Sequence, residues 1–212
     1  MAITENGPQG AHRGKIGNLV YYILNGQQVA RKNGRKTKPP TEAQLAHQAK
    51  VKLVNTFLKT IKDFIHVGFS IERLGTTKNA FNLAVEHNFH KIVSGTYPDL
   101  DLDYSKLLVS IGKLKPAQNP TVANDTEGLR FNWDTNPQMP FLEATDQVMM
   151  LAYFPVQRKS VCTLFGKDRL SGTDLLYLPE DFRAEYAETY IAFISSDRKQ
   201  LSDSFYLGPL NT

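Results

Sequence analysis

The segment GLRFNWD, residues 128–134, indicates the fold class of the C-terminal half of this 212-residue chain. Its apolar side chains, which end on Trp133, alternate with polar ones, and this period of two is typical of a β-strand with one buried face. Turn residues separate six other short β-prone runs, which predict strands at 106–112, 147–154, 160–165, 173–178, 188–196 and 202–207. Seven such strands predict an antiparallel β-sandwich over residues 101–212.

Two of these strands are apolar on both faces. The segments QVMMLAYF (147–154) and YIAFI (190–194) contain almost no polar side chain. A sheet in a sandwich needs only one buried face, and a soluble monomer seldom leaves a large apolar patch in water. We therefore expect the helical pair, the hairpin or a second subunit to cover the outside of this sheet. The side chains to be covered are Met149, Leu151 and Tyr153, or Ile191 and Phe193.

A long amphipathic helix is predicted before the strands. The segment TKPPTEAQ (37–44) contains two prolines, which exclude a helix upstream of them. It also contains a capping box, in which the hydroxyl of Thr41 and the side chain of Gln44 bond to the first free amides of a helix. Apolar residues then recur at helical spacing, which predicts a helix over 42–67 that Gly68 ends.

A second helix is predicted over 77–94, with Thr76 or Thr77 as its N-cap and Gly95 as its end. Its apolar stripe and the short connection to the first helix favour an antiparallel helical pair. The change from helical to strand periodicity falls near 96–104.

The N-terminal region is predicted to contain a β-hairpin. Two β-prone runs, 18–24 and 27–32, flank Asn25-Gly26, a pair that favours the positive φ angles of a type I′ turn. The glycine-rich residues 1–17 are interpreted as a flexible or irregular arm. A two-stranded hairpin is marginal in water, so we expect it to pack against another element.

Composition excludes several classes of protein. No run of about eighteen apolar residues is present, so we expect no membrane-spanning helix. The N-terminus is polar and lacks the apolar core of a secretory signal, and the single cysteine, Cys162, excludes an internal disulfide. These features favour a cytoplasmic protein, with export by a route without a cleaved signal left open.

The net charge of +4 is concentrated near the N-terminus, where residues 1–60 carry ten Lys or Arg and two Asp or Glu. Two interpretations of this basic segment stay open. In the first, the cations contact nucleic-acid phosphates while Tyr21 and Tyr22 stack on bases. In the second, the charges are a solvated polar face. The candidate nucleic-acid-binding residues are Arg13, Lys15, Arg31, Lys32, Arg35, Lys36 and Lys38.

Four histidines are candidate metal ligands. His87 and His90 lie at i, i+3 on the second predicted helix, so they share a face. A metal site would need His47 or His66 from the first helix as a further ligand. Exposed polar residues on a helix face are the simpler interpretation, because no known metal-binding pattern fits.

Acidic residues and the cysteine give no catalytic site either. Asp99, Asp101 and Asp103 alternate, but the glycine and glutamate of a calcium-binding EF-hand loop are missing. Cys162 lies in an alternating strand, where a small buried thiol is expected. We therefore expect no metal, no cofactor and no enzymatic activity, with a hydrolase that uses dispersed acids as an alternative.

Two strands of the C-terminal half resemble those of fibronectin type III and related immunoglobulin-like domains. GLRFNWD is similar to their B strand, which ends on a core tryptophan, here Trp133. TYIAFISSD (189–197) is similar to their F strand and places Tyr190 where their tyrosine-corner residue stands. The resemblance implies an immunoglobulin-like sandwich, and such domains mostly bind partners or act as spacers.

The whole chain also resembles a bacterial family of unknown function. The segments that carry this resemblance are GKIGNLVYYILNG, TKPPTEAQL, YPDLDLDYSK, DQVMMLAY, TYIAFIS and SDSFYLG. The resemblance implies no activity, substrate or site.

These observations together predict an α+β protein with two domains. Residues 1–100 hold the basic arm, the β-hairpin and the helical pair, and residues 101–212 hold the immunoglobulin-like antiparallel β-sandwich. The expected function is a non-enzymatic binding or assembly module, with a protein partner or with a second copy of itself. Nucleic-acid binding through the basic arm and hairpin is the alternative.

Overall fold

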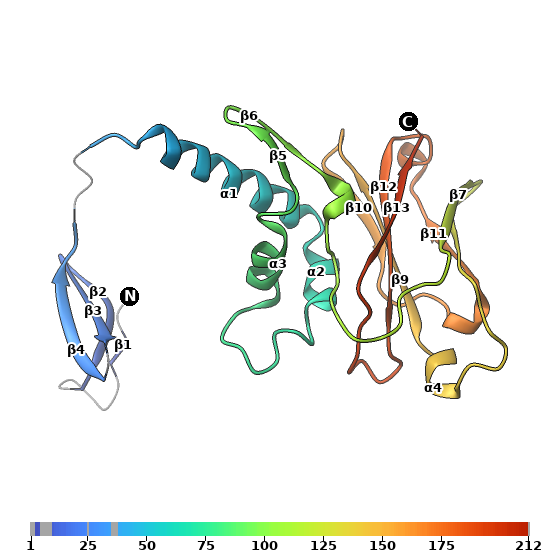
Figure 1. Ribbon diagram of the computed structural model, residues 1–212, viewed down its shortest axis with the longest axis horizontal. Coiled ribbons are helices and arrows are strands. Elements are labelled where there is room, and N and C mark those ends of the chain that lie inside the picture. Colours follow the sequence, from blue (N-terminus) through green and yellow to red (C-terminus); the bar gives the residue numbers. More distant parts are fainter. Residues whose placement is uncertain (1–2, 5–9, 25, 35–37, 212) are drawn as a thin grey trace. The chain divides into compact units, whose positions relative to one another are not determined.

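The computed structural model of the protein describes residues 3–4, 10–24, 26–34 and 38–211 (Figure 1). Contacts divide the chain into two units, Met1–Glu42 and Ala43–Thr212, and each is described by itself. Helices and antiparallel sheets are both present, so the α+β class is confirmed. The boundary expected after residue 100 lies inside the second unit, because the helices and the four-stranded sheet share one hydrophobic core.

The N-terminal unit is a four-stranded antiparallel sheet. Its strands are β1 (Ile3–Thr4), β2 (His12–Ile16), β3 (Leu19–Leu24) and β4 (Gln27–Lys32), and they pair in chain order. The hairpin of β3 and β4 is therefore confirmed. Gly26 has φ +79° in its turn, while Asn25 lies outside the described residues.

The prediction of an irregular arm over residues 1–17 is wrong for the part that the structure describes. His12–Ile16 forms strand β2, which pairs with β3 through a tight turn. Gly17 has φ +55° in this turn, a conformation that glycine adopts without strain. The glycine therefore closes a second hairpin instead of loosening the chain.

No described side chain of the N-terminal sheet is buried. Over 10–24, 26–34 and 38–42 every residue is half-buried or exposed, including the apolar residues of β3. A sheet gains most of its stability from packing one apolar face against another element. Within its own unit, the described part of this sheet has no such packing.

The first predicted helix is present but divided. Helix α1 (Glu42–Thr60) begins directly after Thr41, as predicted, and α2 (Lys62–Gly68) follows after a break at Ile61. At the break, the hydroxyl of Thr60 donates to the carbonyl of Phe57, and Ser160 donates to the carbonyl of Thr60 over 2.7 Å. A side chain that bonds to helix carbonyls in this way bends the helix.

Gly68 is the last residue of α2, but packing, and not helix capping, requires a glycine at this position. A β-carbon at Gly68 would lie 2.2 Å from the carbonyl oxygen of Val109. The amide of Ile111 also donates to the carbonyl of Gly68 over 3.0 Å. The glycine is therefore needed because the segment after the helices packs directly against its backbone.

The second helix is shorter than predicted. Helix α3 (Ala80–Asn88) is capped by Asn79, whose side chain accepts from the amide of Asn82 over 2.8 Å, and not by Thr76 or Thr77. Its last residue, Asn88, is fully buried and bonds through its side chain to Leu108, with two distances of 2.8 Å. This anchor lies beyond the reach of a sequence pattern, because its partner is twenty residues away.

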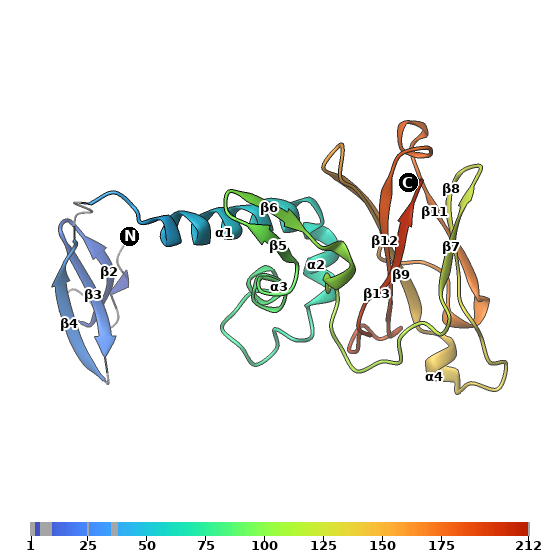
Figure 2. The ribbon, with the colours of Figure 1, turned by 45° about the horizontal axis from the view of Figure 1, so that its top comes forward.

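The residues after α3 form a small hairpin instead of the end of a helix. Its strands are β5 (Val93–Thr96) and β6 (Asp99–Leu102), and Gly95 has φ +77° within it. Figure 1 and Figure 2 both show this hairpin beside α1.

The remaining chain forms two antiparallel sheets. One has the order β11-β8-β7 and the other has the order β10-β9-β12-β13. Their strands are β7 (Thr121–Asp125), β8 (Gly128–Asn132), β9 (Gln147–Phe154), β10 (Lys159–Thr163), β11 (Thr173–Tyr177), β12 (Ala187–Ile194) and β13 (Phe205–Leu210). A short helix, α4 (Phe141–Ala144), lies between β8 and β9.

Five of the predicted strands match β8 to β12 closely, and a sixth, 202–207, overlaps the start of β13. The strand predicted at 106–112 is wrong, and β7 had not been predicted. The 106–112 segment instead packs against Gly68, and its amides at Val109 and Gly112 donate hydrogen bonds to the side chains of Ser204 and Asp203. Its apolar residues are buried by packing without a strand partner, which periodicity cannot distinguish from a strand.

One hydrophobic core contains side chains of both sheets. Leu129, Phe131 and Trp133 share one buried face, as GLRFNWD predicted. They pack against the inward side chains of β9 and β12, which include Met150, Phe154, Ile191 and Phe193. Trp133 meets Phe193 edge to face with ring centroids 5.5 Å apart.

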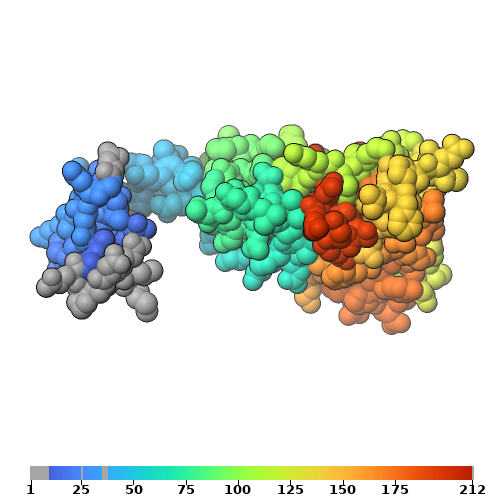
Figure 3. Space-filling view, turned by 90° about the horizontal axis from the view of Figure 1, so that it is seen from below, coloured from blue at the N-terminus to red at the C-terminus, as the bar shows by residue number. Residues whose placement is uncertain are grey.

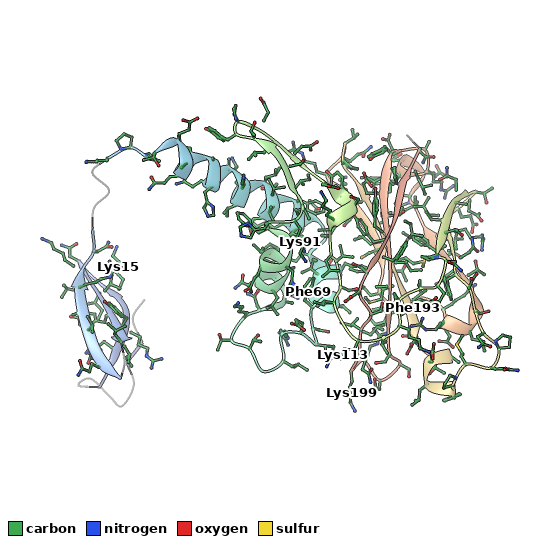
Figure 4. All side chains as sticks on the ribbon, viewed as in Figure 1. Lys15, Phe69, Lys91, Lys113, Phe193 and Lys199 are labelled. Atoms are coloured by element: carbon green, nitrogen blue, oxygen red, sulfur yellow. The ribbon has the colours of Figure 1, made fainter. Side chains whose placement is uncertain are left out.

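A second core lies between the four-stranded sheet and the helices. Met149, Leu151 and Tyr153 of β9 pack in one cluster with side chains of α1, α2 and α3 (Figure 4 labels Phe69 of this core and Phe193 of the other). The expectation that another element covers the outside of this sheet is confirmed, and of the three alternatives the helices are the element that packs there. On β12, however, the covered residues are Tyr190, Ala192 and Ile194, so the assignment of Ile191 and Phe193 to the outer face is wrong.

Tyr190 also departs from the tyrosine corner that the resemblance implied. Its hydroxyl donates over 2.8 Å to the backbone carbonyl of Tyr104, 86 residues earlier, whereas a tyrosine corner bonds a few residues upstream. Tyr190 therefore ties the four-stranded sheet to the segment that follows the helices.

Among the described residues, no helix combines the length and the apolar character needed to cross a bilayer.

Candidate functional site

A cavity of about 470 Å3 opens between α1, the β5–β6 hairpin and the turn after β9. One face of α1 supplies a wall, because residues three and four apart project the same way from a helix. The hairpin and the segment 153–158 supply the rest. The lining residues that matter below are Lys52, Thr56, Phe57, Asp101, Tyr104, Tyr153 and Arg158.

Three aromatic rings pack together at this cavity. The ring of Phe57 meets Tyr153 edge to face at 4.9 Å and Tyr104 at 5.6 Å, and the two tyrosine rings lie 5.6 Å apart. Burial raises the pKa of Tyr104, and the neighbouring Tyr153 raises it further. Burial also raises the pKa of Tyr153. Both phenols are therefore protonated at neutral pH and can donate hydrogen bonds.

The exposed edge of the cavity is charged. Lys52 on α1, Arg158 in the β9–β10 turn and Asp101 on β6 all line it and are solvent-exposed. Within the part of the chain that the structure describes, Lys52 and Arg158 form no ion pair. Asp101 accepts a bond from the amide of Leu102.

The opposite end of the two sheets, here called the loop end, gathers the loops 133–146, 164–172 and 195–204. Their closeness follows from the register, because Ile194 pairs with Gln147 and Thr163 with Met150. Seen from below in Figure 3, α4 (yellow) lies next to the 195–204 loop (red). The hydroxyls of Thr145 and Ser196 are 3.4 Å apart at this junction.

An internal ion pair fixes the loop end. Arg169 donates to Asp146 over 3.0 Å, and about 5% and 3% of these side chains remain exposed. Arg169 also donates to the carbonyl of Lys115 over 2.8 Å and lies 3.8 Å from the ring centroid of Phe193. The backbone carbonyl of Arg169 accepts from the indole of Trp133 over 2.7 Å.

Large apolar side chains are exposed on this rigid support. Phe141 and Leu142 of α4 are 79% and 77% exposed, and Phe165 in the next loop is 69% exposed. Leu170 is exposed on the short turn Arg169–Ser171, which contacts α4. Large apolar side chains that are exposed as a patch on a monomer usually mark an interaction site.

A buried carboxylate with tyrosine partners lies on the helix-facing side of β12. Glu188 accepts from Tyr206 over 2.6 Å and from Tyr186, and only 3% of it is exposed. Burial and the hydrogen bond to Glu188 raise the pKa of Tyr186 to about 12. The strand register places Glu188 opposite Tyr153, so this group adjoins the aromatic side of the cavity.

The structure separates the predicted nucleic-acid-binding residues. Lys15, Val20 and Arg31 pair in one row across β2, β3 and β4, so both cations lie on the same face of the sheet. Lys32 pairs with Leu19 and therefore lies on the opposite face. Arg13 is on β2, and Lys38 lies in the segment before α1. Arg35 and Lys36 lie outside the described residues.

Three of the four candidate histidine ligands contact aromatic rings, and the fourth, His66, is exposed on α2. His47 and His90 both pack edge to face on Phe89, at 5.4 Å and 4.9 Å, and His87 lies 5.9 Å from Phe69. Among the described residues, no three His, Cys, Asp or Glu side chains gather into a possible metal site. Asp103 caps the turn Tyr104–Lys106 and pairs with Lys106 over 2.7 Å.

Sequence reasoning did not find the cavity or the loop end. The cavity draws on α1, the hairpin and the β9–β10 turn, which are up to about a hundred residues apart in the chain. No local motif links these segments. For the loop end, the sequence offers one local indication, the adjacent Phe141 and Leu142 after a proline. A search for strand periodicity does not detect this pair.

Comparison with known proteins adds one positive finding. No curated protein and no solved structure matches the chain. One family model does, and it covers residues 11–208, which span most of both units. This protein therefore belongs to a family of unknown function, DUF6266.

Proposed function

We propose that the protein is a non-enzymatic binding or assembly module that docks a protein partner at its loop end. The observation that carries this proposal is the exposure of Phe141 and Leu142 on a support held rigid by Asp146 and Arg169. Apolar and aromatic anchors on a preorganised surface are the residues that dominate protein interfaces.

The arrangement of strands supports an immunoglobulin-like sandwich as the scaffold. Among the seven strands β7 to β13, the first, second and fifth form one sheet, and the third, fourth, sixth and seventh form the other. In immunoglobulin domains the A, B and E strands likewise share one sheet and the C, F and G strands share the other. Loops at one end of that scaffold carry binding residues in antibody variable domains, which is an analogy of fold only.

A photocrosslinking experiment tests the proposal in living cells of the source organism. The photoreactive residue p-benzoylphenylalanine replaces Leu142 in one variant and Val156 in the matched control. Val156 is 76% exposed but lies in the β9–β10 turn at the other end of the same sheet. We expect a discrete adduct from position 142, with the mass of a second copy or of another protein, and none from position 156. No adduct at 142, or the same adducts at both positions, contradicts the proposal.

Nucleic-acid binding is the second candidate, and the row of Lys15, Val20 and Arg31 favours it. Tyr22 lies on the same face, two residues from Val20, where its ring is available for stacking. Met1–Glu42 carries seven Lys or Arg and two Asp or Glu, whereas the remaining chain carries eighteen and nineteen. The net positive charge of the protein therefore comes from the N-terminal unit.

Fluorescence anisotropy with a labelled single-stranded oligonucleotide tests this second candidate. The affinity should fall steeply with salt, and Lys15→Gln with Arg31→Gln should lower the salt slope by about one unit per lost phosphate contact. Lys32→Gln, on the opposite face, is the control and should change the slope less. Equal effects of all three substitutions, or no binding by the wild type, argue against it.

A further inference from the structure

We propose that the cavity between α1, the β5–β6 hairpin and the β9–β10 turn binds a small organic anion that has an aromatic or branched apolar body. This site belongs to the helix-bearing side of the protein. It is independent of the docking proposed for the loop end, which lies at the other end of the sheets.

The size and walls of the cavity suit such a body. Its volume of about 470 Å3 lies within the range of roughly 300–1,000 Å3 that is usual for small-molecule sites. The apolar part of the wall comes from helix α1, from the hairpin and from the turn. It consists of Ala49, Leu53, Phe57, Pro98, Leu100, Leu102 and Pro155.

The aromatic side of the cavity is preorganised. Phe57 and Tyr153 are almost completely buried, and both belong to the core beneath the helices. Their edge-to-face contact at 4.9 Å and the contact of each with Tyr104 hold the rings in place. A ligand body therefore meets a surface that needs little reordering, which favours binding.

The charges at the rim select an anion. Lys52 and Arg158 approach from two different elements, and neither has an ion-pair partner among the described residues. Asp101 is the one acidic residue among those that line the cavity. A carboxylate gains two cations and meets one like charge, whereas an ammonium group meets two like charges. Partial exclusion of water by the apolar body strengthens this preference.

A titration with two small probes tests the inference. The probes are 4-phenylbutyrate and 4-phenylbutylamine, which share one apolar body and carry opposite head charges. Amide chemical shifts of the full-length protein report where each probe binds and detect affinities in the millimolar range. We expect 4-phenylbutyrate to shift signals of residues around Thr56 and Leu100, and 4-phenylbutylamine to bind at least tenfold more weakly.

Two variants and one control complete the test. Thr56→Phe, at an exposed position of the wall, should fill the cavity and weaken 4-phenylbutyrate binding at least tenfold without altering the core. Lys52→Gln should weaken it severalfold. Lys59→Gln is the control, because Lys59 is exposed on α1 but does not line the cavity.

Three results would overturn the inference. They are the absence of shifts at the lining residues with either probe, equal binding of the two probes, and wild-type affinity in Thr56→Phe. A dispersed amide spectrum of each variant shows that it is folded. Because crosslinking at position 142 reports on the loop end alone, failure of this inference and failure of the proposed function are distinguishable.

Discussion

Arg169 and Asp146 form an ion pair of 3.0 Å whose two side chains are almost completely removed from solvent. The guanidinium of Arg169 also donates to the carbonyl of Lys115 and stacks on the ring of Phe193. One arginine thus joins two loops, the segment before β7 and the core between the sheets.

Replacing this arginine should lower the free energy of unfolding. Arg169→Met leaves Asp146 buried without its cation and frees the carbonyl of Lys115, so we expect a loss of about 3–5 kcal/mol in urea unfolding. The matched control is Lys115→Met, which breaks the exposed pair with Glu143 of 2.8 Å and should cost less than about 1 kcal/mol. Similar losses in both variants contradict the structural role of the buried pair.

The same variant predicts a pH dependence. Burial raises the pKa of Asp146, and Arg169 counteracts this. Without Arg169 the folded-state pKa rises further above the unfolded value of about 3.9. The folded state of the variant then binds the proton of Asp146 more tightly than the unfolded state does. The contribution of Asp146 to stability is therefore most favourable below pH ~3.9 and falls as the pH rises through the folded pKa. We expect the loss caused by Arg169→Met to be smaller at pH 4 than at pH 7, and equal losses would contradict this.

Gly68→Ala should destabilise the protein although alanine favours helices. The added β-carbon would lie 2.2 Å from the carbonyl of Val109, which belongs to rigid backbone. Overpacking of this kind costs about 1–3 kcal/mol, against a gain in helix propensity of about 1 kcal/mol. Gly34→Ala, where a β-carbon meets nothing within 4 Å, is the control. Thermal unfolding that is unchanged in Gly68→Ala would show that the close contact is not maintained in solution.

Tyr190→Phe tests the link between the four-stranded sheet and the segment after the helices. The substitution removes the 2.8 Å bond to the carbonyl of Tyr104 at a fully buried position. We expect a loss of about 1 kcal/mol in urea unfolding, because the carbonyl loses its donor. Tyr177→Phe, at an exposed position, should leave stability unchanged.

Stability should decline at alkaline pH. Burial raises the pKa of Tyr190 and Tyr206, and the Glu188 carboxylate raises both further. Phenols that must stay protonated to remain buried stabilise the fold below the unfolded pKa of about 10, and this contribution falls as the pH rises through the folded values. Urea unfolding between pH 8 and 11 measures the decline. Glu188→Gln removes the carboxylate and should make the decline shallower, whereas the exposed Glu180→Gln should not.

The N-terminal sheet should be much less protected than the four-stranded sheet that contains β12. None of its residues with described burial is buried, whereas every residue of β12 is buried. Local opening therefore exposes little apolar surface in the N-terminal sheet and much in β12. In hydrogen exchange of the full chain, amides of 19–32 should exchange at least tenfold faster than those of 187–194. Equal protection would show that the N-terminal sheet is covered in solution.

Burial patterns in the sequence were sufficient for most strands and for the start of α1. GLRFNWD identified β8 and its inner face, and the doubly apolar QVMMLAYF correctly required a covering element. Such patterns report that a side chain is buried, but not by which partner. The 106–112 segment was therefore mistaken for a strand, and Ile191 was placed on the wrong face of β12.

Element ends and sites depended on residues that are far apart in the chain. Ser160 bonds the carbonyl of Thr60 at the break between α1 and α2, and Asn88 ends α3 with its bonds to Leu108. Each contact joins segments whose closeness exists only after folding.

The α+β class, most strands, the first helix and the net positive charge of the N-terminal region could all be predicted from the sequence, because periodicity and charge are local properties. Tertiary packing was needed to place the helices in one core with the four-stranded sheet. It alone also assembled the cavity around Tyr153 and the rigid loop end around Arg169, because both require backbone segments to meet that no local pattern links.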